Sequence, residues 1–183
     1  MKKLIRKIVR KLHGEQDINK LIRRGLTVGP DFKCMEGVII DSSHCWHITI
    51  GKNVTLAPRV HILAHDASTK VFLDYTRVSN VKIGDNVFVG AGSIILPGVT
   101  IGSNVVIGSG SVVVKNIPDN SVAVGNPAKV VKSLNAFLEE KKQEMKHEVV
   151  FGEEFTLRNP NFGEEERKKL KKEVETYGKV FVY

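Results

Sequence analysis

Aliphatic residues and glycines recur every six residues along the middle of the chain. From Ile83 the sequence divides into six consecutive hexads: IGDNVF, VGAGSI, ILPGVT, IGSNVV, IGSGSV and VVKNIP. The first position of every hexad is Ile or Val, and the fifth is small or aliphatic. A six-residue period cannot mark one face of an α-helix, because every sixth residue would point in a new direction around the axis. The pattern instead predicts short strands joined by tight turns.

Three strand-and-turn sides close one triangular coil of about 18 residues. We expect the first position of each hexad to point into the prism and the fifth to sit near a corner. The frequent Gly and Asn residues tolerate the turn geometry. Four to five coils stacked at about 4.8 Å give a prism roughly 20–24 Å tall. The predicted fold class is therefore mainly β, a parallel β-helix of hexapeptide repeats over residues 25–132.

The repeat is interrupted once. The same phase starts upstream at Ile50, Leu56 and Ile62, but the step from Ile62 to Ile83 is 21 residues, which is not a multiple of six. We therefore predict an inserted loop over residues 68–82. The open ends of such a coil need covering, and the two flanks of the chain are the candidates.

The N-terminal flank, residues 1–24, has the pattern of a basic amphipathic helix. Apolar residues recur at helical spacing from Leu4 to Leu12, with Lys and Arg between them. Two interpretations stay open. The segment either lies on an acidic membrane surface, as a peripheral association through residues 1–12, or packs across the end of the prism with its charges in water.

The C-terminal extension, residues 133–183, predicts two helices joined by a link that contains Gly and Pro. The first is expected over Ser133 to His147 and the second over Glu164 to Tyr177. Both are rich in Lys and Glu, unlike the middle block. Composition thus divides the chain into the flank 1–24, the prism 25–132 and the extension 133–183.

Charge and composition argue against nucleic-acid binding and against a membrane-spanning protein. The 183-residue chain carries a formal charge of +8, made up of +7 in residues 1–24, +2 in residues 25–132 and −1 in residues 133–183. The absence of aromatic interleaving argues against nucleic-acid binding. No apolar run approaches the roughly 18 residues of a membrane span. Cys34 and Cys45 lack CxxC spacing, so we expect reduced thiols in a cytoplasmic protein.

Three stretches carry a family resemblance: IGKNVTLAP from Ile50, the hexad array from Lys82, and AVGNPAKVVK from Ala123. Together they resemble the hexapeptide-repeat acyltransferases, and more narrowly the maltose and galactoside O-acetyltransferases and the related polysaccharide O-acetyltransferases. The resemblance implies a left-handed β-helix and acetyl-CoA as co-substrate. It also implies a homotrimer with the cofactor groove between neighbouring prisms.

In that family the catalytic histidine follows the LAPxVxI rung, which places it here at His65. The family usually has a proline next, where this chain has Asp66. Moving an acetyl group from a thioester to a sugar hydroxyl needs a base for the hydroxyl proton, and neutral imidazole suits that task. Asp66, as a neighbour on an extended chain, points the other way and is a poor candidate to orient the imidazole.

The resemblance also implies the acetyl-CoA site, at positions matched by motif. Small residues admit the flat pantetheine arm, and cations meet the nucleotide phosphates. Val114 replaces a threonine common in the family, which removes one hydroxyl contact. The implied cofactor-binding residues are Ala91, Ser109, Val114, Lys115, Lys129 and Lys132.

The acceptor is expected to be a carbohydrate hydroxyl, of a sugar or a cell-surface polysaccharide precursor. Asp41, His44 and Trp46 lie about one coil before His65 and are the candidate substrate contacts.

One alternative function is that of a zinc hydratase of the carbonic-anhydrase kind built on the same fold. We expect no metal, because no histidine occurs between His65 and His147 to supply ligands from later coils. The other alternative is a non-catalytic β-helix binding protein.

Overall fold

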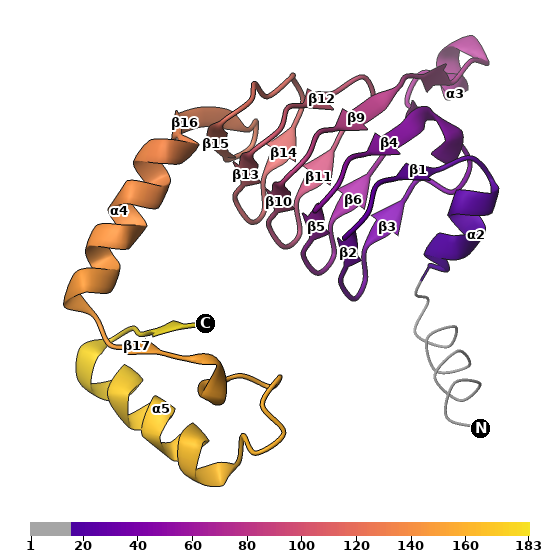
Figure 1. Cartoon of the computed structure of the whole chain (residues 1–183). Coiled ribbons are helices and arrows are strands. Elements are labelled where there is room, and N and C mark those ends of the chain that lie inside the picture. The colour runs from indigo at the N-terminus through magenta and orange to yellow at the C-terminus, as the bar shows by residue number, and fades with distance from the viewer. Residues whose placement is uncertain (1–15) are drawn as a thin grey trace, which may run out of the picture. The chain divides into compact units, whose positions relative to one another are not determined.

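The computed structural model describes residues 16–183, and it divides them into two compact units (Figure 1). The first unit ends at Leu134, and the second runs from Asn135 to Tyr183. The amphipathic helix expected over residues 1–12 lies outside the described residues. Among those described, no helix combines the length and the apolar run that a membrane crossing requires.

The first unit is a triangular prism with three sheets, one for each side, in which all strands but β16 pair in parallel. Sheet A contains β1 (Thr27–Val28), β4 (Ile48–Ile50), β9 (Val81–Ile83) and β12 (Thr100–Ile101). Sheet B contains β2 (Lys33–Cys34), β5 (Thr55–Leu56), β10 (Val87–Val89), β13 (Val105–Ile107), β15 (Ser121–Val124) and β16 (Lys129–Ser133). Sheet C contains β3 (Ile39–Ile40), β6 (His61–Ile62), β11 (Ile94–Ile95) and β14 (Val112–Val113). The predicted mainly β coil is confirmed.

The inward positions are those that the hexads predict. All six first-position side chains are at most 2% exposed, and all six fifth-position side chains are at most 4% exposed. In sheet C the register stacks Ile62, Ile95 and Val113 in one ladder. The two polar fifth positions are satisfied, because the hydroxyls of Ser93 and Ser111 both donate to the Gly108 carbonyl, at 2.9 and 2.6 Å.

One corner of the prism is held by a ladder of asparagines. Asn53, Asn86, Asn104 and Asn120 all have left-handed backbones, with φ between 51° and 58°. Asparagine tolerates this region better than other side chains that carry a Cβ. The side-chain amide of each of the first three donates to the next asparagine, at 3.0, 3.0 and 3.1 Å. The ladder therefore fixes the turn conformation and the coil register together.

Both ends of the prism are covered. Near the first coil lies α2 (Ile18–Arg23), whose Leu21 is 3% exposed, and the Cys45 thiol lies 3.7 Å from the carbonyls of Leu21 and Arg24. The Gln16 amide pairs with both backbone groups of Ile40, at 2.7 and 2.9 Å, and so satisfies an open strand edge. At the far end β16 runs antiparallel to β15 and ends the parallel stacking.

The insertion is a short hairpin carrying one helical turn. It consists of β7 (His65–Asp66), α3 (Lys70–Leu73) and β8 (Arg77–Val78), with β8 antiparallel to β7. The coil resumes with β9 at Val81, so Val81 and Lys82 belong to the prism rather than to the loop expected over 68–82.

The second unit contains α4 (Leu134–His147), β17 (Val150–Phe151), η2 (Glu153–Phe155), α5 (Glu164–Tyr177) and β18 (Phe181–Val182). The two helices match those predicted from the sequence, within one residue at the start of α4. Strands β17 and β18 pair in parallel, and Phe151 is 7% exposed. Its ring lies 4.2 Å from that of Phe155, and Lys169 Nζ stands over both rings, at 5.8 and 5.4 Å.

The asparagine corner yields a stability prediction. Asn86→Ala forces an alanine to φ 54° and removes two amide hydrogen bonds, so we expect unfolding to become easier by about 1–3 kcal/mol. Asn86→Gly removes the same amide bonds but tolerates the φ value, and it should cost about 1 kcal/mol less than the alanine variant. Urea unfolding followed by circular dichroism measures both. Equal losses for the two variants would show that backbone strain contributes nothing at this corner.

Candidate functional site

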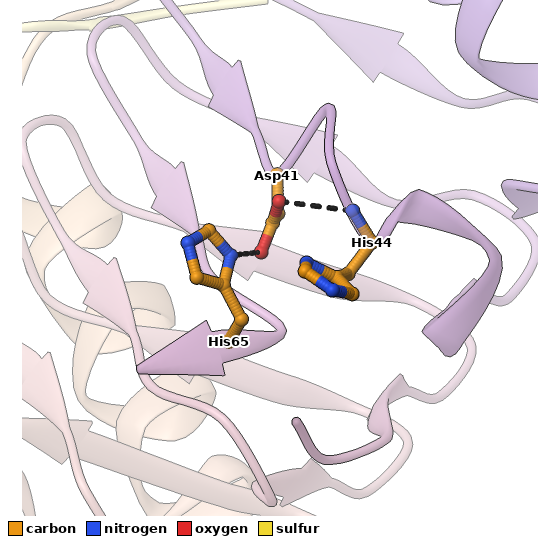
Figure 2. A group of neighbouring side chains, drawn as sticks. All are labelled: Asp41, His44 and His65. Carbon is orange, nitrogen blue, oxygen red and sulfur yellow. Dashed lines mark hydrogen bonds and ion pairs between the residues drawn. The ribbon is translucent and has the colours of Figure 1, made fainter. Parts of the chain in front are cut away.

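The carboxylate of Asp41 is buried and accepts four hydrogen bonds. Oδ1 accepts from the backbone N–H groups of Ser43 and His44, at 3.0 and 3.1 Å. Oδ2 accepts from the backbone N–H of Ala64 at 3.0 Å and from Nδ1 of the His65 ring. Figure 2 shows the carboxylate between His65 and His44, with its two oxygens on different partners. Asp41 is 5% exposed, so these protein donors replace water.

The coil geometry brings Asp41 and His65 together. Ile40 of β3 pairs in register with Ile62 of β6, and the backbone N–H of Asp41 donates to the Ile62 carbonyl at 2.8 Å. The two residues thus leave neighbouring strands at the same corner. The step between Ile40 and Ile62 is 22 residues, four more than a regular coil of about 18. The longer connection contains the bend capped by Asp41 Oδ1 and the 3₁₀ turn η1 (Cys45–His47).

The hydrogen bonds keep Asp41 ionised. Burial alone raises the pKa of its carboxyl, but the hydrogen bonds from His65, Ala64 and His44 lower it further than burial raises it. The resulting pKa lies below the ordinary value of 3.8. A negative charge therefore faces the His65 ring at neutral pH.

The side chain of His65 is anchored at one nitrogen and open at the other side. Because a carboxylate only accepts hydrogen bonds, the proton of the pair lies on Nδ1, and Nε2 presents the lone pair of the neutral ring. The side chain is 32% exposed, so solvent and small ligands reach it. This arrangement can take a proton from a bound hydroxyl group, and the carboxylate stabilises the imidazolium that forms.

Asp66 does not take part in this pair. Its carboxylate accepts from the backbone N–H of Ser68 at 2.9 Å and pairs with the Arg77 guanidinium at 3.3 Å, within the β7–β8 hairpin. The expectation that Asp66 would not orient the imidazole is consistent with these contacts. The orienting carboxylate comes from the preceding coil instead.

Of the three residues expected to contact an acceptor, His44 lies against His65, Trp46 lies against His44, and Asp41 is buried. The His44 ring centroid lies 4.8 Å from that of His65 and 5.6 Å from that of Trp46. Trp46 is 51% exposed, and its ring centroid also lies 5.9 Å from that of His47. Asp41, expected as an acceptor contact, is bonded to His65 and to three backbone N–H groups and lies inside the protein.

The same cluster is a group of potential metal ligands. Asp41, His44 and His65 each offer one ligand atom, and these atoms all lie within 4.8 Å of one another. A carbonic-anhydrase centre with ligands from later coils finds no support, because the sequence has no histidine from residue 66 to residue 146.

The residues expected to bind acetyl-CoA lie at two corners of the prism and on the strand β16. Ala91 and Ser109 lie at the same corner of successive coils, where the Gly110 N–H donates to the Ala91 carbonyl at 2.8 Å. Lys129 begins β16 opposite Val124, and Lys132 lies on the same strand. Val114 and Lys115 follow β14 and share with His65 the corner at which the strands of sheet C end. Ala91, Ser109, Val114, Lys115 and Lys129 are exposed, and Lys132 is half-buried.

The sequence analysis missed the pairing of Asp41 with His65. The sequence does contain a signal for this pairing. Ile40 and Ile62 occupy the same place in neighbouring coils, so Asp41 lies level with Leu63, two residues before His65. Finding it requires knowing that the coil between them holds four extra residues. A strict count of 18 misaligns the two strands and separates the pair.

A family model described as bacterial transferase hexapeptide (six repeats) matches residues 80–115. Protein CapG of Staphylococcus aureus is 44% identical to this chain over 145 residues, which cover 75% of this chain and 81% of CapG. The chain matches less than half the length of several other curated relatives.

The solved structures similar to this one include two acetyltransferases. A maltose O-acetyltransferase from Clostridium difficile superposes with a TM-score of 0.53 at 34% identity, over 69% of this chain and 83% of that chain. A hexapeptide-repeat acetyltransferase from Vibrio cholerae, solved with acetyl-coenzyme A, has a TM-score of 0.53 at 26% identity, over 58% and 59% of the two chains. The predicted left-handed β-helix of hexapeptide repeats is confirmed by these matches.

The buried carboxylate yields a pH prediction. Because its folded pKa lies below 3.8, the Asp41 charge stabilises the folded chain above about pH 4, and this stabilisation is lost as the pH falls through the lower folded pKa. Asp41→Asn should therefore lower the free energy of unfolding by about 2–4 kcal/mol at pH 7. The difference from the unsubstituted chain should shrink toward pH 3. Urea unfolding at a series of pH values measures it.

Asp74→Asn is the matched control, since Asp74 is exposed at the end of α3 and asparagine tolerates its φ of 61°. It should show little change at either pH. A constant stability difference for Asp41→Asn between pH 7 and pH 3 would contradict an ionised Asp41 in the folded chain.

Proposed function

This chain belongs to the hexapeptide-repeat acyltransferases, and we propose that it transfers an acetyl group from acetyl-CoA to a carbohydrate hydroxyl with His65 as the general base. The observation that carries the proposal is the pair of Asp41 and His65, in which a buried ionised carboxylate holds an open imidazole. Family membership supports an acetyltransferase that uses acetyl-CoA. The sugar acceptor is supported by the similarity to a maltose O-acetyltransferase.

The proposed reaction is a direct transfer between two bound substrates. His65 Nε2 takes the proton of the acceptor hydroxyl while its oxygen attacks the acetyl carbonyl carbon. The C–S bond then breaks, and the proton passes from the imidazolium to the CoA sulfur. Asp41 stabilises the imidazolium between these steps and keeps the ring in one orientation. Backbone N–H groups of nearby turns are candidates to stabilise the oxyanion. No serine or cysteine nucleophile is needed.

The cofactor is proposed to lie along the prism wall between His65 and β16. Ala91 and Ser109 offer small, exposed side chains at successive turns, and Gly92 and Gly110 beside them have no neighbouring atom within 4 Å of an added Cβ. The open surface suits the flat pantetheine arm. Lys115, Lys129 and Lys132 supply cations for the phosphates. Val114, 41% exposed, adds an apolar contact.

The proposed acceptor surface is the row of rings beside His65. Trp46 offers an exposed face on which a sugar ring can stack, and His44 lies between it and His65. The chain is further proposed to act as a homotrimer in the cytoplasm on a sugar or a cell-surface polysaccharide precursor.

A peripheral membrane association through residues 1–12 is also part of the proposal. These residues hold six Lys or Arg and no acidic residue. The chain enters the described structure at Gln16, which is bonded to Ile40 beside Asp41. A basic segment tethered there would keep the enzyme close to an acceptor carried on an anionic membrane.

The general-base role predicts the effect of His65→Ala. Removing the imidazole should lower kcat by about 100-fold to 10,000-fold, because a positioned base contributes that much to such a step. The release of free CoA thiol from acetyl-CoA, measured on a panel of mono- and oligosaccharides, reports the rate. Circular dichroism should show an unchanged fold, since His65 lies outside the core of the prism.

Lys129→Ala is the matched comparison for this experiment. It should raise KM for acetyl-CoA and leave kcat within about three-fold, because it removes an interaction with a part of the cofactor that does not react. A His65→Ala variant that keeps its full kcat would overturn the proposed mechanism.

The membrane association predicts binding to vesicles. The full chain should sediment with vesicles that contain anionic lipid and much less with purely zwitterionic vesicles, and added salt should release it. Replacing Lys7, Arg10 and Lys11 by Glu should remove most of this binding. A triple variant of Lys168, Lys171 and Lys172 to Glu, on α5, is the control for net charge. Equal loss in both variants would contradict a specific role for residues 1–12.

A further inference from the structure

The His44 imidazole has a feature that the proposed acetyl transfer does not use. Its Nδ1 atom is buried and has no hydrogen-bond partner among the residues that the structure describes. A buried polar nitrogen without a partner destabilises the folded chain, because it has lost its hydrogen bond to water. The neighbouring histidine of the same turn is satisfied, because His47 Nδ1 bonds to the Asn80 side chain at 2.8 Å. The cost at His44 therefore points to a ligand.

Three side chains of the kind that bind transition metals, His44 among them, lie together at this corner. Asp41 contributes a carboxylate oxygen, and His44 and His65 contribute ring nitrogens, all within 4.8 Å of one another. Two imidazoles and one carboxylate form a common zinc ligand set, with a fourth position left for water. Ligand atoms on a zinc ion lie about 2.0–2.2 Å from the metal, so rotations that move the rings by about 1 Å would close this set.

We propose that Asp41, His44 and His65 form a zinc-binding site that switches the enzyme off. Metal binding rests on the geometry of the three side chains alone, whereas the inhibition rests on the proposed function. Neutral imidazole has one lone pair, so a His65 that coordinates zinc cannot take the proton of a hydroxyl group. The site is thus an inhibitory site and not the resident metal centre of a hydratase.

The surroundings of the cluster favour a specific site over loose binding to surface histidines. Asp41 is held by three backbone N–H groups, which fix its carboxylate in place without a metal. His44 is fixed at its own backbone, because its N–H is one of these donors. Two of the three ligands are therefore positioned by one bend of the chain. Such preorganisation lowers the entropy cost of binding a metal ion.

The test uses the full chain, freed of metal with a chelator and then titrated with zinc chloride in a calorimeter. We expect about one zinc ion per chain. With cobalt chloride the visible spectrum should show the intense bands of a four-coordinate site. His44→Ala should weaken zinc binding at least ten-fold, in keeping with the loss of one ligand. His47→Ala, in the same turn but outside the cluster, should bind zinc with unchanged affinity.

His44→Phe keeps a ring in the same place and serves if the alanine variant unfolds. Zinc binding of unchanged affinity in both His44 variants, or no binding to the unsubstituted chain, would overturn the proposal. In a parallel assay, acetyl transfer should fall with rising zinc at the concentrations at which zinc binds, and a chelator should restore it. Binding without inhibition would overturn the switch. Activity that survives His65→Ala would overturn the proposed function and leave the binding result standing.

Discussion

The hydrogen bonds between successive coils are the constraint on which the rest of the structure depends. Each strand is only two to five residues long, so no side of the prism is stable by itself. Stacking in register joins these short strands into sheets and places aliphatic side chains above one another, as in the ladder of Ile62, Ile95 and Val113. A shift by one residue in any coil would turn its buried side chains outward. The six-residue period in the sequence is the consequence of this requirement.

The catalytic arrangement is built where the period fails. The connection between Ile40 and Ile62 is longer than a regular coil. The hairpin that begins at His65 is inserted before the next coil, which starts at β9. Both irregularities fall at the same corner, where Asp41 and His65 leave β3 and β6. Regular coils fill every inward position with small or aliphatic groups and leave no room for a buried charge. The longer connection supplies two of the three backbone N–H groups that stabilise this charge, those of Ser43 and His44.

The hexads contain enough information to predict the coil. Positions such as Ile95 and Ser93 are buried because their place in the repeat demands it, so a count of six finds them. The turn asparagines also follow from local chemistry, since the left-handed conformation restricts the choice of residue. The Asp41–His65 pair could not be found this way. It depends on the number of residues in an irregular bend, which local propensity does not determine, and His44 Nδ1 is buried only because of how that bend folds. The hairpin likewise begins where the phase breaks, but the start of β9 at Val81 depends on pairing with β4.

The antiparallel strand β16 ends the coil by pairing with β15, and this gives the prism a fixed length. His65 leaves the coil on the level of β6, whereas Lys129 and Lys132 lie on β16, beyond β10, β13 and β15. Each added or deleted coil would change their separation by one strand spacing of about 4.8 Å. In the proposed function the number of coils therefore sets the distance between His65 and these lysines. This distance must match the span between the thioester of a bound CoA and its phosphates. An extra coil of three hexapeptides between β11 and β15 would preserve the fold and every local contact of His65. It would nevertheless move Lys129 and Lys132 one strand spacing further from His65.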